Sequence, residues 1–187
     1  MTNFFSLDLP DSVVCATALE ELRDVASPMI VNHSLRCFFL GRAYAQKRDL
    51  PFDAEGLFLA AAYHDLGLCP AHRNRKEPFT RVGSRALDAH AAEHGIDEAR
   101  RRTLVDAIEY HMWPVPRWSK SREAGLMQLS AWMDVMYWRR WSLAKEVKAI
   151  EARLPREGLT LGFMPCLLAT IGSPASVLGL AAPGLYR

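Results

Sequence analysis

Gly56-Leu-Phe-Leu-Ala-Ala-Ala-Tyr63 is followed directly by His64-Asp65 and then by Leu66-Gly67-Leu68. Eight residues without a charge predict a helix that is apolar on all faces and lies in the core. Asp53 is its predicted N-cap and Gly67 its predicted stop. An unpaired charge at the end of a buried helix costs roughly several kcal/mol. The pair therefore indicates either a cation bound between the two side chains or a His-Asp hydrogen bond that braces the core.

The composition is typical of a globular protein with one domain. The chain has 187 residues, of which 50% are hydrophobic and 24% charged, and this size allows a sizeable core. A net charge of +2 gives no strong basic field, so we expect neither nucleic acid nor a membrane as partner. Four scattered cysteines without a Cys-x-x-Cys pair, and no secretory signal in residues 1–10, predict a cytoplasmic protein with free thiols.

Nearly all of the chain is predicted to be helical. Long segments repeat their apolar residues with a period of 3.6, and no run of alternating β-branched residues lies between turns. A proline- and arginine-containing loop is expected over residues 69–79. The predicted helices cover residues 10–25, 28–48, 54–66, 82–94, 97–113 and 122–141, with continuation of the last to Arg153 as an alternative.

A tail without charged residues runs from Gly158 to Tyr186. Pro165, Pro174 and Pro183 interrupt it too often for a straight transmembrane helix. We expect short helices that pack on the core or at a homo-oligomer interface. The predicted organisation is one domain over residues 1–187, with the core at about 10–155 and the tail at 158–187.

Histidines lie on the apolar faces of two predicted helices. In a helical projection His33 shares a stripe with Ile30 and Cys37, and Arg36 lies at the edge of that stripe. His111 lies with Leu104 and other apolar residues of its own helix. Each histidine taken singly is explained as a hydrogen-bonded core residue.

An aspartate lies on the aromatic-rich inner face of the predicted helix over residues 122–141. Asp134 shares this face with Tyr137, Trp138 and Trp141, and an aspartate in such surroundings is seldom unpaired. His33, His64-Asp65 and Asp134 together supply two imidazoles and two carboxylates for one divalent ion. This donor set suits Zn, Fe, Mn or Co rather than a thiolate site.

The order His33, His64-Asp65, Asp134 resembles the HD superfamily of metal-dependent hydrolases. Asn-His-Ser-x-Arg within residues 27–36 and His-Asp-x-Gly within 57–68, followed by stretches 105–111 and 132–134, are similar to its cyanamide hydratase-like branch. The resemblance implies an all-α HD-domain helical bundle. It also implies that His33, His64, Asp65 and Asp134 hold one metal, which is zinc in the hydratases.

The chain departs from that branch at two positions. Thr80 stands where the branch has a glutamate, and Met112-Trp113 follows His111 where Thr-Thr is common. Both positions belong to the expected substrate pocket, so the substrate stays open. The two-metal HD enzymes place a histidine near position 80, and its absence here favours a single metal.

A competing motif, His90-Ala-Ala-Glu-His94, matches the inverted zinc-protease pattern. That pattern needs a further acidic ligand, and the helix is predicted to end at Gly95, directly after His94. A histidine in the last turn of a helix is commonplace and interacts favourably with the helix dipole. We therefore do not assign the site to this motif.

The expected reaction is attack by a metal-activated water on a small polar substrate. Asp65 is the candidate for steering the proton of that water, and His111 for proton transfer or substrate orientation. Arg36, His72 and Trp113 are the candidate substrate contacts. The resemblance favours addition of water to a cyanamide or nitrile-type group. The alternatives are a phosphohydrolase acting on nucleotides or other phosphomonoesters, and a catalytically idle HD domain that binds a ligand or partner.

Overall fold

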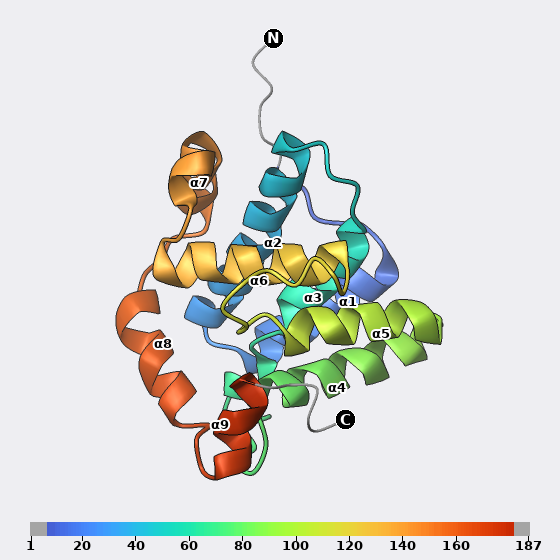
Figure 1. Cartoon of the computed structure of the whole chain (residues 1–187), viewed down its shortest axis with the longest axis vertical. Coiled ribbons are helices and arrows are strands. Elements are labelled where there is room, and N and C mark those ends of the chain that lie inside the picture. The colour runs from blue at the N-terminus through green and yellow to red at the C-terminus, as the bar shows by residue number, and fades with distance from the viewer. Residues whose placement is uncertain (1–6, 182–187) are drawn as a thin grey trace.

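The computed structural model describes residues 7–181, which form helices and no strand (Figure 1). The all-α prediction is therefore confirmed. The largest differences from the predicted segments are at the C-terminal ends of the fifth and sixth helices, which end at Glu109 and Met136. The helices are α1 (Val13–Val25), α2 (Pro28–Lys47), α3 (Ala54–Tyr63), α4 (Phe79–Glu93), α5 (Glu98–Glu109), α6 (Arg122–Met136), α7 (Ala144–Arg153), α8 (Leu159–Leu168) and α9 (Pro174–Ala181), with 3-10 turns η1 (Leu66–Leu68) and η2 (Arg140–Leu143).

Helix α3 is the central element. Every residue from Gly56 to Tyr63 is buried, and α3 contacts α1, α2, α4, α5 and α6. Asp53 caps the helix as predicted, because its Oδ1 accepts a hydrogen bond from the Gly56 amide at 2.9 Å. Arg100 of α5 binds the same carboxylate, with its Nε 2.7 Å from Asp53 Oδ2. Because α3 is enclosed on all sides, the His64-Asp65 pair at its end is delivered to the interior of the protein.

Two glycines bring α4 into backbone contact with the end of α3. A Cβ on Gly83 would lie 2.3 Å from the Tyr63 carbonyl oxygen, and one on Gly67 would lie 2.4 Å from the Phe79 carbonyl oxygen. The predicted stop at Gly67 falls beyond the end of α3 at Tyr63, because Gly67 lies within η1, and its φ is not positive. The reason for glycine here is close packing.

The prediction that the sixth helix reaches Trp141 is wrong, because α6 ends at Met136. Tyr137 and Arg139 adopt the left-handed conformation, with φ of 58° and 57°, which ends an α-helix. Tyr137 is consequently 57% exposed and Trp141 82% exposed, so neither lies on the inner face beside Asp134. The alternative of an uninterrupted continuation to Arg153 is excluded for the same reason.

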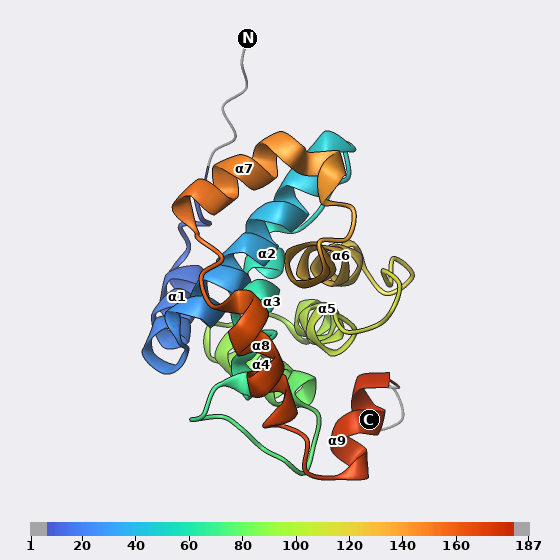
Figure 2. The ribbon, with the colours of Figure 1, turned by 90° about the vertical axis from the view of Figure 1, so that its left-hand side faces the viewer.

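Within the described residues, the tail from Gly158 onward forms two short helices, α8 and α9. Figure 2 shows α7, α8 and α9 following one another down the molecule. Helix α8 contacts α2 and places the Phe163 ring 5.6 Å from the His33 ring, centroid to centroid. None of the described helices has the length and apolar character that a membrane crossing requires. Residues 182–187 of the predicted tail lie outside the described residues.

Replacing Gly83 tests the close packing of α4 against α3. We expect Gly83→Ala to lower the free energy of unfolding by about 1–3 kcal/mol through overpacking. In an exposed helix the same change would instead stabilise by about 1 kcal/mol. Urea denaturation gives the difference. The matched control is Gly162→Ala in α8, where the new Cβ would meet only the flexible Met29 side chain, 2.6 Å from its sulfur. Equal free energies of unfolding for the two variants would contradict the packing account.

Candidate metal centre

Two imidazoles and one carboxylate meet at the end of α3. The Nε2 atoms of His33 and His64 lie 3.2 Å apart, and each lies 3.3 Å from Asp65 Oδ2. Three atoms at these separations form the face of a tetrahedron whose centre is about 2.0 Å from each of them, which is a normal zinc–ligand distance. All three side chains are at most 1% exposed. His33 comes from α2, and the other two residues come from the turn between α3 and η1.

A third imidazole, that of His111, faces the same carboxylate. It follows the end of α5, and its Nε2 lies 3.7 Å from Asp65 Oδ1. The two oxygens of the Asp65 carboxylate therefore face different histidines. Its Oδ2 faces His33 and His64, whereas its Oδ1 faces His111. Ligand atoms of His64, Asp65 and His111 all lie within 4.8 Å of one another.

The other ring nitrogen of each histidine is held by a hydrogen-bond acceptor. His64 Nδ1 donates to the Ala61 carbonyl at 2.8 Å, and His111 Nδ1 donates to the Ile108 carbonyl at 2.6 Å. His33 Nδ1 donates to Asp134 Oδ2 at 2.7 Å. In a neutral imidazole a proton on Nδ1 leaves a lone pair on Nε2. When neutral, each of the three rings would therefore present an Nε2 lone pair toward Asp65, as metal-binding histidines do toward their ion.

The Asp65 carboxylate itself accepts no hydrogen bond. Both of its oxygens are buried and without a hydrogen-bond partner, because the contacts with the imidazoles are within ion-pair distance but not oriented as hydrogen bonds. A buried carboxylate without a compensating partner costs several kcal/mol. Imidazole nitrogens and carboxylate oxygens are the donors that divalent transition metals take from proteins. The residues present therefore fit a metal ion.

The pKa shifts indicate that protonated imidazoles offset the negative charge of Asp65 when no ion is bound. Burial raises the pKa of Asp65, but His64 and His33 more than offset this and hold it below its usual range. Burial lowers the pKa of His64, but Asp65 and Cys37 raise it to about 9. Burial likewise lowers the pKa of His33, but Cys37, Asp134 and Asp65 raise it well above its usual value. A metal bound to these nitrogens would release those protons.

His111 behaves differently from the other two histidines. Burial and the nearby His64 lower its pKa to about 3. Its ring is therefore neutral at physiological pH, with the Nε2 lone pair directed at Asp65 Oδ1. A neutral imidazole has a free Nε2 lone pair, but a pKa this low makes His111 a weak base in the metal-free protein.

Asp134 lies behind His33 and has no free acceptor position. Arg36 donates to both of its oxygens at 2.8 Å, Arg156 donates to Oδ1 at 2.8 Å, and His33 Nδ1 donates to Oδ2. A carboxylate has about four lone-pair positions, and these four donors fill them. The structure thus places Asp134 against the Nδ1 side of His33, away from the Nε2 atoms, and it gives Arg36 a charged partner within the core.

A cavity of about 170 Å³ opens above the Asp65 carboxylate. His33, His64, Asp65 and His111 line its polar floor. The walls come from apolar side chains of α6, α8 and the residue after His111: Met112, Ala131, Trp132, Val135, Met136, Phe163, Met164 and Leu167. Of these wall residues, Met112 was placed in the expected substrate pocket from the sequence and the others were missed, although the uncharged character of the tail was a signal for those on α8.

Three candidate substrate contacts lie outside the lining of this cavity. The Arg36 guanidinium is bound to Asp134 and to the Leu154 and Pro155 carbonyls. Trp113 instead packs on the Tyr110 ring, with centroids 6.2 Å apart. His72 belongs to the loop between η1 and α4, where its amide donates to the Cys69 carbonyl.

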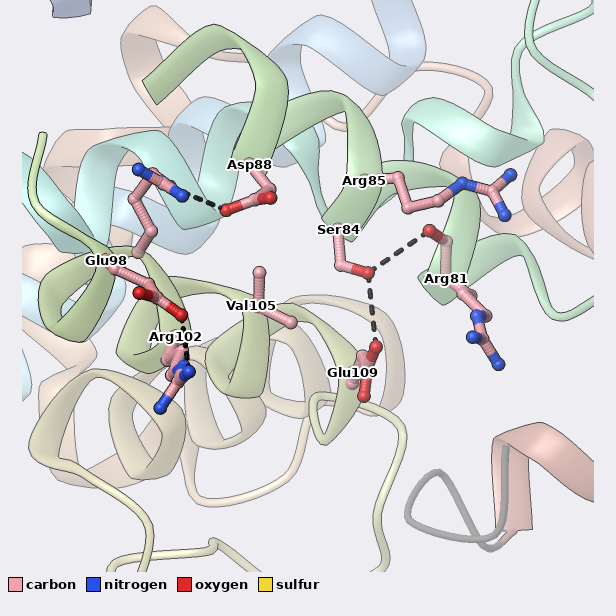
Figure 3. Close-up of a pocket in the computed structure, with 9 residues that line it drawn as sticks. Arg81, Ser84, Arg85, Asp88, Glu98, Arg102, Val105 and Glu109 are labelled. Atoms are coloured by element: carbon pink, nitrogen blue, oxygen red, sulfur yellow. Dashed lines mark hydrogen bonds and ion pairs between the residues drawn. The ribbon is translucent and has the colours of Figure 1, made fainter. Parts of the chain in front are cut away.

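A larger groove, of about 340 Å³, lies between α4 and α5 (Figure 3). Three of its four arginines form ion pairs with acids of the protein itself: Arg85 with Glu77, Arg101 with Asp88 and Arg102 with Glu98. Glu109 accepts a hydrogen bond from Ser84 at 3.3 Å. The groove therefore has no cluster comparable to that around Asp65.

The histidines of the competing motif fasten α4 to its neighbours. His90 Nε2 donates to the Val14 carbonyl of α1 at 3.0 Å, and His94 Nε2 lies within hydrogen-bond distance of Thr17 Oγ1 of the same helix, at 3.2 Å. Within the described part of the chain, neither belongs to a group of side chains close enough to share a metal. A packing role accounts for both.

The family model described as HD domain matches residues 30–152, about two thirds of the chain. The matched region contains every residue of the cluster. A search of curated proteins finds no match.

Metal binding at Asp65 should be visible as thermal stabilisation. Zn²⁺ at about 100 times its Kd adds about 2.7 kcal/mol, so we expect the Tm of metal-free protein to rise by roughly 5–10 °C. Asp65→Asn should abolish the rise, whereas His94→Ala should keep it. Differential scanning calorimetry measures all three. A full rise in Asp65→Asn would place the ion elsewhere.

Proposed function

The chain belongs to the HD-domain family, and we propose that it is a metal-dependent hydrolase or hydratase that adds water to a small, uncharged polar substrate. Members of this family are in general metal-dependent hydrolases. The proposal rests on one observation, the buried Asp65 carboxylate that has no hydrogen-bond partner at the floor of a cavity. The resemblance to the cyanamide hydratase-like branch supports a cyanamide or nitrile-type group as the part that reacts.

We assign metal binding to His33, His64 and Asp65, whose ligand atoms have the separations of a tetrahedral face. Zinc is the expected ion, with Fe, Mn and Co as alternatives. Asp134, which the resemblance implies as a further ligand, is assigned instead to orienting His33 through Nδ1, a common arrangement around zinc. When bound, the ion would lower the pKa of water toward about 7 and so supply a nucleophile at neutral pH.

The two oxygens of Asp65 have separate roles in this proposal. Oδ2, which faces His33 and His64, belongs to the metal site, whereas Oδ1 steers the proton of the attacking water toward His111. The neutral His111 accepts that proton at Nε2 and returns it to the substrate atom that gains charge. The hydrogen bond from Nδ1 to the Ile108 carbonyl holds the ring in this tautomer.

The alternatives have less support. A phosphate group is commonly held by arginine or lysine side chains in addition to a metal, and neither arginine nor lysine lines the cavity. The arginines of the neighbouring loop bind carbonyls of the protein, Arg73 that of Leu68 and Arg75 that of Ile171. The cluster around Asp65 has the residues that metal chemistry needs, which disfavours a catalytically idle domain.

A substrate panel on metal-loaded protein tests the proposed activity. We expect cyanamide or small nitriles to be hydrated and nucleoside monophosphates to remain intact, measured as urea or amide and as free phosphate. Because His64 and Asp65 hold the ion, His64→Ala and Asp65→Ala should lose both metal and turnover. Their control, His94→Ala, should keep both. Phosphate release without hydration would establish the phosphohydrolase instead.

Replacing His111 separates proton transfer from metal binding. We expect His111→Gln to lower kcat by about 10²–10⁴-fold, because the proton acceptor is lost. The metal content should stay near that of the unchanged protein, since His111 is not assigned as a ligand. Elemental analysis and steady-state kinetics measure the two quantities. Loss of the metal together with activity would make His111 a ligand.

A further inference from the structure

The walls of the cavity above Asp65 restrict which substrates can bind more than the polar residues at its floor do. All polar groups of the lining belong to His33, His64, Asp65 and His111, apart from the Trp132 indole N–H. That N–H is already engaged, because it donates to the His111 carbonyl at 3.2 Å. The remaining wall residues are methionines, aliphatic residues and Phe163. A bound molecule therefore meets hydrogen-bonding groups at one end only.

The volume restricts the size of the substrate. About 170 Å³ is below the roughly 300–1,000 Å³ of pockets that take drug-sized ligands, so the cavity is matched to a smaller molecule. Met136 and Met164 are 63% and 51% exposed and both line the cavity, so flexible side chains form its rim and admit small molecules.

A charged or doubly polar substrate would be penalised in this cavity. The amino group of cyanamide would be directed at apolar walls if its nitrile carbon lay at the floor, and a buried donor without a partner is costly. A carboxylate on the substrate would meet no cation. An alkyl group in the same place would instead gain from burial among Val135, Phe163 and Leu167.

We propose that the preferred substrates are short uncharged alkyl nitriles, with the nitrile at the His64-Asp65 floor and the alkyl group between α6 and α8. This inference rests on the proposed function. In the reaction the oxygen of one water forms a bond to the nitrile carbon while one carbon–nitrogen π bond breaks, and the two protons of the water end on the former nitrile nitrogen after tautomerisation. The product is the corresponding amide, and neither oxidant nor further reactant is needed.

Chain length is the variable that tests the proposal. We expect kcat/KM to rise by about fourfold for each added methylene from acetonitrile to butyronitrile, and cyanamide and cyanoacetate to be poorer than propionitrile. Calorimetric titration of the same nitriles into metal-free protein gives a second readout that does not depend on turnover. Their Kd should fall with chain length in the same order.

Two variants in the walls provide a matched pair. Ala131→Leu fills the cavity from α6 and should move the optimum to shorter nitriles, whereas Leu167→Ala enlarges it from α8 and should move the optimum to longer ones. Metal content and Tm identify any variant that has lost the metal site or the fold. If either variant has done so, the nitrile series on the unchanged protein still tests the proposal.

The outcomes distinguish this inference from the function on which it rests. Hydration of cyanamide with no dependence on alkyl length, or equal turnover of cyanoacetate and propionitrile, would overturn the alkyl nitrile proposal and leave the hydratase. Absence of turnover for every nitrile and for cyanamide, on protein shown to contain metal, would overturn both.

Discussion

Charge balance around the Asp65 carboxylate is the constraint on which the rest of the structure depends. A carboxylate with no hydrogen bond to either oxygen is stable in the core only when positive charge lies beside it. Protons on His33 and His64 supply that charge in the metal-free protein, and a divalent ion would supply it in their place. The burial of Asp65, which is only 1% exposed at the end of the enclosed helix α3, makes this necessary.

A second carboxylate shows the opposite arrangement. Asp134 is as deeply buried as Asp65, but two arginines and one imidazole fill its acceptor positions. Through Arg36 and Arg156 it connects α2 and α6 to the segment that precedes α8. The same contacts that orient His33 therefore also hold α8, which supplies one wall of the cavity. The geometry of the metal site and the shape of the substrate pocket are thus set by one network.

Local sequence patterns predicted the helices and the inward direction of His33, His64, Asp65 and His111, because helical periodicity determines which side chains meet the core. They did not predict that α6 ends at Met136, since nothing in the sequence marks Tyr137 as left-handed. The hydrogen-bond acceptor positions of Asp134 are filled only because Arg156, which lies beyond α7, also donates to it. Such tertiary contacts leave no periodic signal in the sequence. Trp113 was a predicted substrate contact because it lies at a pocket position of the family, just after His111. The chain turns at this point, and Met112 lines the cavity in place of Trp113.

The most direct test of this account is a crystal structure of the metal-loaded protein with diffraction measured at the absorption edge of the bound ion. The account predicts one anomalous peak, at about 2.0–2.2 Å from His33 Nε2, His64 Nε2 and an oxygen of Asp65, with Asp134 still bound to both arginines. A peak at another position, or a carboxylate of Asp65 that is satisfied by water alone, would contradict it.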